Sequence, residues 1–133
     1  MITNGNCTVI NRVYNPDRRM DEWVTTHLFG VFWENTKGMS VVKSGAKEAD
    51  GVRVFIPFGI KSDKVYKAPK AFEKAPNGFF TLRPEDILIY GVVSDITNIA
   101  KLQNEYDDVM TITEVNRMNF GSPRMQHWEV SGK

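Results

Sequence analysis

The sequence predicts a mainly β protein, a small antiparallel β-barrel or sandwich with one short helix and one long loop. Three observations lead to this prediction. Short runs of β-branched and aromatic residues alternate with polar residues along much of the chain. Turn-forming residues separate these runs at close intervals. The chain also lacks the strand–helix–strand alternation that marks a parallel sheet.

Two strands of the N-terminal half have clear boundaries. Residues 8–14 are β-branched and aromatic, and the turn formers Asn15, Pro16 and Asp17 follow them. Residues 51–57 alternate apolar and other side chains with the period of two that a half-buried strand shows. The proline that closes this second run ends the strand or places it at an edge.

The region 23–33 is predicted as a long strand with a glycine in its middle. Gly30 in this position indicates a β-bulge or a bend, and bent strands allow small sheets to curl into barrels. Strict alternation then assigns the remaining side chains to two faces. The first face holds Trp23, Thr25, His27, Phe29 and Val31, and the second holds Val24, Thr26, Leu28 and Phe32.

The remaining elements complete a count of seven or eight strands and one helix. Asp95 or Thr97 is expected to cap a short helix at about 96–106, where Ile99, Leu102 and Tyr106 form one apolar face. A turn over residues 83–86 separates two of the strands. The other strands are expected at 41–43, 79–82, 87–93, 109–115 and 126–130.

Residues 58–78 are predicted to form a long lysine-rich loop. Apolar residues follow no period there, and Pro69 and Pro76 argue against a continuous helix. Loops of this length are uncommon in small domains and tend to be functional or flexible. The lysines recur every three or four positions, at Lys61, Lys64, Lys67, Lys70 and Lys74.

Composition restricts the class of protein. A chain of 133 residues fits a single domain over residues 1–133, and the net charge of +1 does not suit a general duplex-DNA binder. Residues 1–70 carry 11 Lys and Arg against 7 Asp and Glu, whereas residues 71–133 carry 6 against 9. This mild polarity suits copies that meet with opposite signs, although a mixed solvated surface is the simpler explanation and the one we favour. We expect a soluble intracellular protein with no membrane partner.

The residues favour a protein that is not an enzyme and that holds no metal or cofactor. His27 and His127 are far apart in the sequence, and a lone strand histidine is most often structural. Cys7 lies in an apolar run and is expected to be buried rather than nucleophilic. The acidic pairs 85–86 and 107–108 fit turn and helix-end chemistry, since neighbouring strand residues point to opposite faces.

Four segments resemble small proteins encoded among the structural genes of tailed phages and prophages of Firmicutes, which are uncharacterised or described as minor capsid proteins. The resemblance covers most of the chain, and the terminal His-Trp-x-Val-x-Gly-Lys is its most specific part. Where those proteins commonly have Pro-Gly-Asp, this chain has Pro84-Glu85-Asp86. The segments are residues 8–15 with 30–33, 52–57, 82–91, and the run from 106–113 through 121–123 to 127–133.

The resemblance implies a virion component of the head–tail connection, such as a head-closure (stopper), neck or tail-completion protein. Such a protein would form a homo-oligomeric ring around the DNA channel, in contact with portal, adaptor or tail proteins. It would reside in the virion, and in the host cytoplasm before assembly. Stoppers look like small β-barrels with a long loop and a short helix, as predicted here from the residues.

Two groups of residues are candidate contact sites in such a ring. The five lysines of 58–78 would face the DNA end, because lysine suits sequence-independent phosphate contact; otherwise they only keep the loop solvated. His127, Trp128 and Lys133 would form a docking segment that adds a strand to a partner's edge. For Trp128 we favour the other role, as a plug of the barrel core.

One rival function is a barrel that binds single-stranded nucleic acid. It requires surface aromatic residues near the lysines on which bases stack. The near-neutral net charge counts against it. The candidates are Phe55, Phe58, Tyr66, Phe72, Phe79 and Phe80.

Overall fold

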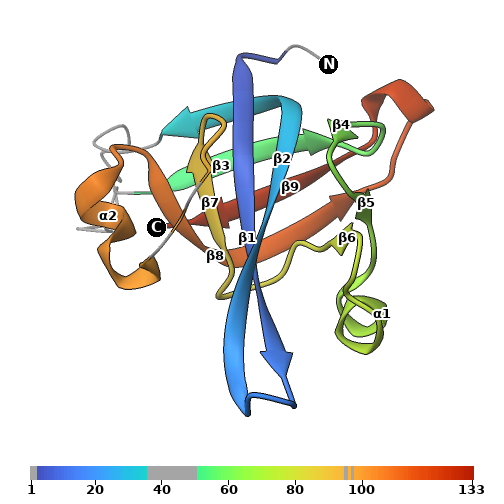
Figure 1. Cartoon of the computed structure of the whole chain (residues 1–133). Coiled ribbons are helices and arrows are strands. Elements are labelled where there is room, and N and C mark those ends of the chain that lie inside the picture. The colour runs from blue at the N-terminus through green and yellow to red at the C-terminus, as the bar shows by residue number, and fades with distance from the viewer. Residues whose placement is uncertain (1–2, 36–50, 95, 97) are drawn as a thin grey trace, which may run out of the picture.

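The computed structural model describes residues 3–35, 51–94, 96 and 98–133, and it shows a closed antiparallel β-barrel (Figure 1). Six strands close the barrel in the order β1-β7-β8-β9-β3-β2, and β2 returns to pair with β1. The mainly β prediction is therefore confirmed, with a barrel rather than a sandwich. The six strands are β1 (Gly5–Asn15), β2 (Met20–Asn35), β3 (Val52–Pro57), β7 (Ile87–Tyr90), β8 (Val109–Met118) and β9 (His127–Gly132).

Several short elements accompany the six barrel strands. The strand β4 adds to the outer edge of β2, and β5 pairs in parallel with β6. The expected strand at 41–43 lies outside the described residues. The remaining elements are β4 (Lys61–Ser62), β5 (Val65–Tyr66), α1 (Pro69–Lys74), β6 (Phe79–Phe80), η1 (Ile99–Lys101), α2 (Leu102–Glu105) and η2 (Pro123–Met125).

A β-bulge in β2 sets which side chains enter the barrel. Gly5 pairs with Val31 and Asn6 pairs with Phe29, so Gly30 is the extra residue, with φ of 100°. The predicted bulge at Gly30 is confirmed. The placement of Val31 on the face of Phe29 was wrong, because an extra residue reverses the alternation beyond it. Val31 is buried together with Leu28 in the barrel core.

The barrel interior and one outer face of the sheet hold two separate apolar clusters. Cys7 and Val9 of β1 point into the barrel, whereas Ile10 points outward. Ile10 packs there with Ile89 and Leu102 beneath η1 and α2. The interior cluster is formed by Cys7, Val9, Leu28, Val31, Trp33, Val54, Ile56, Phe80, Leu82, Leu88, Met110, Ile112, Trp128 and Val130.

The lysine-rich region 58–78 contains regular structure, contrary to the prediction of an irregular loop. It forms β4, β5 and the short helix α1. Pro69 occupies the first turn of α1, where a missing N–H costs nothing. Phe72 of α1 is buried and anchors the helix. Six helical residues around one buried aromatic are too short to show a period in the sequence.

The predicted helix at 96–106 is shorter and consists of η1 followed by α2. Asn98 caps it, because its side-chain oxygen accepts a hydrogen bond of 3.0 Å from the Ala100 N–H. The predicted caps Asp95 and Thr97 lie outside the described residues. The apolar face is confirmed, since Ile99 and Tyr106 pack with buried Leu102.

The strand bounds differ at several ends from those expected. The strand predicted at 79–82 is confined to β6, and the one at 87–93 ends with β7 at Tyr90, before Gly91 with φ of 99°. β8 continues to Met118, beyond its predicted end. Such shifts of a few residues arise because tertiary pairing decides where a strand stops.

The far half of the β1–β2 hairpin extends beyond the barrel (Figure 1). β7 pairs with β1 only over residues 7–10, and β3 pairs with β2 only over residues 32–35. Within the described residues, 11–15 and 20–24 therefore have strand partners only in one another. The hairpin projects between α1 and α2, which lie on opposite sides of it (Figure 1).

Candidate functional site

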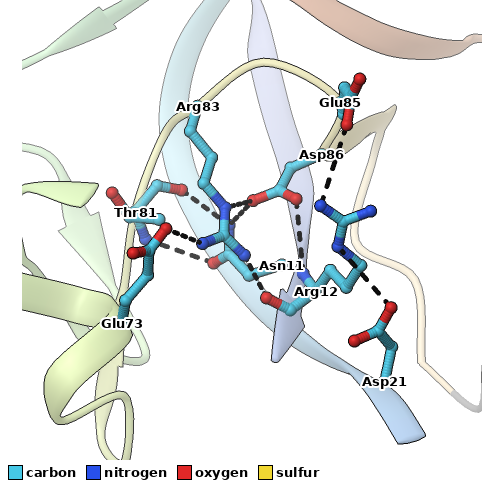
Figure 2. Close-up of polar contacts among 8 residues, drawn as sticks. All are labelled: Asn11, Arg12, Asp21, Glu73, Thr81, Arg83, Glu85 and Asp86. Carbon is cyan, nitrogen blue, oxygen red and sulfur yellow. Dashed lines mark hydrogen bonds and ion pairs between the residues drawn. The ribbon is translucent and has the colours of Figure 1, made fainter. Parts of the chain in front are cut away.

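A buried polar cluster lies where the β1–β2 hairpin leaves the barrel (Figure 2). Its centre is the Asp86 carboxylate, which is 1% exposed and accepts three hydrogen bonds. The donors are the side-chain amide of Asn11 at 2.8 Å, Nε of Arg83 at 2.7 Å and the backbone N–H of Arg12 at 3.4 Å. Asn11 also exchanges two hydrogen bonds with the backbone of Thr81.

Arg83 joins three parts of the fold through this cluster. Its guanidinium donates to Asp86 and to the backbone carbonyl of Arg12, and it lies 3.5 Å from the Glu73 carboxylate of α1. The guanidinium carbon also lies 5.3 Å from the centre of the Phe72 ring, within cation–π distance. The cluster therefore ties α1, the hairpin and the turn before β7 together.

The turn before β7 contains a strained residue. Glu85 has φ of 76°, in the left-handed region that glycine adopts without steric cost. The Glu85 carboxylate lies 3.8 Å from the Arg12 guanidinium, in an exposed ion pair. Such a pair compensates little of the backbone strain.

A groove of about 970 Å³ separates the hairpin from α1. Arg83 of the polar cluster also borders it. The charged side chains of the lining are of both signs, and the arginines among them already have acidic partners. The groove therefore offers no concentrated charge of one sign. The lining residues include Val13, Asn15 and Glu22 on the hairpin side and Glu73, Lys74 and Pro76 on the α1 side.

The five candidate lysines fall into two groups. Lys64 donates a hydrogen bond of 2.8 Å to the Thr25 carbonyl. Lys67 donates one of 3.2 Å to the Ala75 carbonyl, and its ammonium lies 3.9 Å from the centre of the Phe79 ring. These two lysines help to hold the region 58–78 in place. The exposed lysines are Lys61, Lys70 and Lys74, and their contact with DNA stays a prediction.

The candidate docking segment lies within the barrel wall. Trp128 is 5% exposed and packs against Phe58 and Tyr66 in tilted arrangements, with ring centres 4.5 and 4.3 Å away. This is the core position that we favoured for Trp128. β9 pairs with β3 on one side and with β8 on the other, so it has no open edge for strand addition. His127 contacts the Met125 carbonyl, and the Lys133 backbone pairs with Thr111.

Two groups of described residues with opposite net charge lie on opposite sides of the barrel. We define the basic flank as residues 58–78, with five lysines and two acidic residues, together with Arg117 and Arg124. We define the acidic flank as residues 98–108, where Glu105, Asp107 and Asp108 outnumber Lys101. β4, α1 and the β8–β9 connection lie on one side of Figure 1, and α2 lies on the other. Among the described residues, these two flanks therefore carry opposite net charges and face in different directions.

His27 and Cys7 lie in surroundings that are typical of residues with a structural role. His27 lies between the Asp63 carboxylate, 2.7 Å from Nδ1, and the Val93 carbonyl, 2.8 Å from Nε2. Cys7 is fully buried, and burial raises the pKa of its thiol, which disfavours the nucleophilic thiolate. Among the described residues, no group of three or more His, Cys, Asp or Glu could hold a metal ion.

Most aromatic residues near the lysines face the protein interior. Phe72 and Phe80 are each 1% exposed, and Phe58 and Tyr66 pack on Trp128. The half-buried ring of Phe55 packs between Phe32 and His127. A stacking surface for bases requires exposed ring faces. The arrangement of these residues therefore does not favour the single-strand-binding function.

The polar cluster could not be located from the sequence. Asn11, Arg83 and Asp86 have the composition of ordinary strand and turn residues. Only the folded chain shows that the three side chains meet. The turn Arg83-Pro84-Glu85-Asp86 is a local signal, but it does not indicate that Asp86 is buried or that Asn11 is its partner.

Comparison with known proteins places this chain in a family whose function is unknown. No curated protein and no solved structure matches this chain. Within the described residues, no helix is both long enough and apolar enough to cross a membrane. The model of a family of unknown function, DUF6751, matches residues 2–133, nearly the whole chain, and the protein therefore belongs to that family.

Proposed function

We propose that this protein is a structural component of a phage virion, a head–tail connection protein of the stopper, neck or minor capsid type that assembles as a ring around the DNA channel. Four segments of the chain resemble such proteins. The observation that carries the proposal is the placement of the basic flank and the acidic flank on opposite sides of the barrel (Figure 1). Each subunit of a ring uses two different patches, and opposite charges favour their pairing.

The interior of the barrel also suits an assembly role. Its buried core includes Leu28, Val54, Met110 and Trp128, and large side chains fill it. Contacts with other molecules therefore involve the outer surfaces. In the virion those surfaces would meet copies of this chain and the portal, adaptor or tail proteins on either side. Of the exposed lysines, Lys61 would contact the DNA end, whereas Lys70 and Lys74 of α1 would meet the acidic flank of the next copy.

Charge reversal tests the assembly directly. Sedimentation velocity at low salt, over a wide concentration range, should show wild-type oligomers that dissociate as salt screens the flanks. Lys70→Glu/Lys74→Glu should weaken association at least tenfold, as should Glu105→Lys/Asp107→Lys on the other flank. The chain with all four changes has its polarity reversed and should associate again. Arg18→Glu/Arg19→Glu, on the exposed hairpin tip, changes the charge equally and is the control.

Three outcomes would overturn this proposal. A wild-type chain that stays monomeric at every concentration lacks the required self-association. Failure of the fourfold variant to recover shows that the two flanks do not meet. Tight, salt-sensitive binding of a labelled single-stranded oligonucleotide by the monomer would favour the nucleic-acid-binding function.

A further inference from the structure

We infer that the β8–β9 connection, residues 119–126, is the inserting element of the contact between copies and that it seats on the acidic flank of the next copy. The inference rests on the proposed head-to-tail assembly and identifies the two surfaces that meet. The connection lies at the edge of the molecule, beyond the ends of β8 and β9 (Figure 1). It bears two strongly exposed apolar side chains, Phe120 at 73% and Met125 at 58%.

Hydrogen bonds within the connection and to the barrel support its conformation. The Met125 N–H donates to the Ser122 carbonyl at 2.9 Å, and the Gln126 side chain donates to the Gly121 carbonyl at 3.2 Å. The Phe58 N–H donates to the Gln126 carbonyl at 3.1 Å and fastens the connection to the barrel. Apolar side chains on a preorganised loop lose little conformational freedom on binding. This arrangement is suited to insertion into a partner.

The charge of the connection specifies the partner surface. Residues 115–128 contain no aspartate or glutamate, whereas Arg117 and Arg124 are both exposed. A complementary surface therefore combines apolar contact area with carboxylates. A second basic surface would repel Arg117 and Arg124 and would not suit a connection that carries them beside exposed apolar side chains.

The chain itself carries a surface of this kind. Glu105 and Asp107 are exposed on the acidic flank. Val92 precedes the acidic flank in the chain and is 50% exposed, and its neighbour Val93 packs into the same apolar cluster as Ile99 of the flank. The acidic flank and the β8–β9 connection lie on opposite sides of the barrel (Figure 1). One chain cannot bring them together, but the connection of one copy can meet the acidic flank of the next.

Loss of the apolar side chains should weaken assembly. Phe120→Ser/Met125→Ser is expected to lower association, measured by sedimentation velocity, at least tenfold. Tyr14→Ser/Met20→Ser removes two comparably exposed apolar side chains from the hairpin and should leave association unchanged. All four residues are exposed, so far-UV circular dichroism should show the same fold in each variant.

Cross-linking tests the pairing of the two surfaces directly. Phe120→Cys in one preparation and Val92→Cys in another should form a disulfide between chains after mixing and mild oxidation. Native Cys7 is fully buried and does not compete. Phe120→Cys mixed with Tyr14→Cys is the control and should stay uncrosslinked.

The outcomes separate this inference from the proposed function. If the wild type assembles but the serine variants assemble equally well and the 92–120 disulfide does not form, the inference is wrong and the ring proposal stands. If the wild type never associates, the proposed function itself fails. Selective formation of the 92–120 disulfide supports both.

Discussion

The amide of Asn11 donates a 2.8 Å hydrogen bond to the carboxylate of Asp86, although 75 positions separate the two residues. Asn11 continues the inward-facing side of β1 after Cys7 and Val9, at the point where the strand leaves the barrel. Asp86 ends the turn before β7 and is bound by Arg83 as well. The contact thus closes one end of the barrel with polar side chains where the apolar core stops.

Removal of the Asp86 carboxylate should strongly destabilise the fold. Asp86→Ala removes one of the two acceptors of the buried Asn11 amide and the acceptor of Arg83 Nε, which we expect to cost about 3 kcal/mol or more of unfolding free energy. Asp86→Asn should also destabilise the fold, because its amide NH2 group would face the N–H donors that the carboxylate now accepts from. Urea unfolding measures both changes.

Asp21→Ala is the matched control for the Asp86 variants. Asp21 lies 4.0 Å from the Arg12 guanidinium in an exposed pair, so its loss should cost less than about 0.5 kcal/mol. A cost of Asp86→Ala as small as that of Asp21→Ala would show that the cluster does not support the hairpin base.

Glycine at position 85 should relieve backbone strain. The φ of 76° at Glu85 costs a residue with a Cβ about 1 kcal/mol, whereas glycine adopts it freely. Glu85→Gly should therefore be more stable than Glu85→Ala by about 1 kcal/mol, since both variants lose the exposed contact with Arg12. Thermal unfolding of the two variants makes this comparison; an alanine variant that is equally stable would rule out the strain.

Alanine at Gly132 should be poorly tolerated. A Cβ there would overlap the Thr111 carbonyl oxygen and lie 2.8 Å from the Met110 methyl carbon, where β9 meets β8. We expect Gly132→Ala to cost about 2 kcal/mol or more of unfolding free energy, because the backbone must shift. At Gly59 no atom lies within 4 Å of an added Cβ, so Gly59→Ala should be nearly neutral. Equal midpoints in urea for the two variants would contradict this packing.

Stability should fall in alkali because two groups retain their protons in the folded state. Burial raises the pKa of Cys7 above its ordinary 9.0 and the pKa of Tyr66 above its ordinary 10.0. Above those ordinary values, the unfolded chain loses protons that the folded chain keeps, so the unfolding free energy declines as pH rises. Below about pH 9 this contribution is fully present.

Urea unfolding between pH 7 and pH 11 measures this decline. For Cys7, the slope approaches about 1.4 kcal/mol per pH unit above pH 9. Cys7→Ala should remove the part of the decline that begins near pH 9, whatever its effect on absolute stability. An unchanged pH dependence in that variant would show that the thiol ionises equally in both states.

Local patterns predicted many of the elements of the barrel. The alternation in β3 indicated a strand because each residue's exposure there follows directly from the period of two. Gly30 indicated a bulge through its missing Cβ, but not the consequence for Val31. The phase beyond a bulge depends on which residue is left unpaired, and that is a property of the partner strand.

Residues 58–78 show the limit of such patterns. Their two-residue strands β4 and β5 exist because β2 and β6 offer partners, and α1 exists because Phe72 finds a buried position beside Arg83. None of these elements is long enough to leave a periodic signal. The sequence also does not indicate which lysines are held in place. Lys64 and Lys67 donate to the carbonyl groups of Thr25 and Ala75, which are not their neighbours in the chain.

The sequence by itself determined the mainly β class, the position of most strands, the bulge at Gly30 and the apolar face of the short helix, because each follows from residues a few positions apart. Only the tertiary structure decided that the sheet closes through the β1–β2 pairing, that Asn11, Arg83 and Asp86 meet, and that the basic and acidic flanks lie on opposite sides. Those features depend on contacts between distant segments, whose pairing is set by the packing of the whole barrel rather than by any local preference.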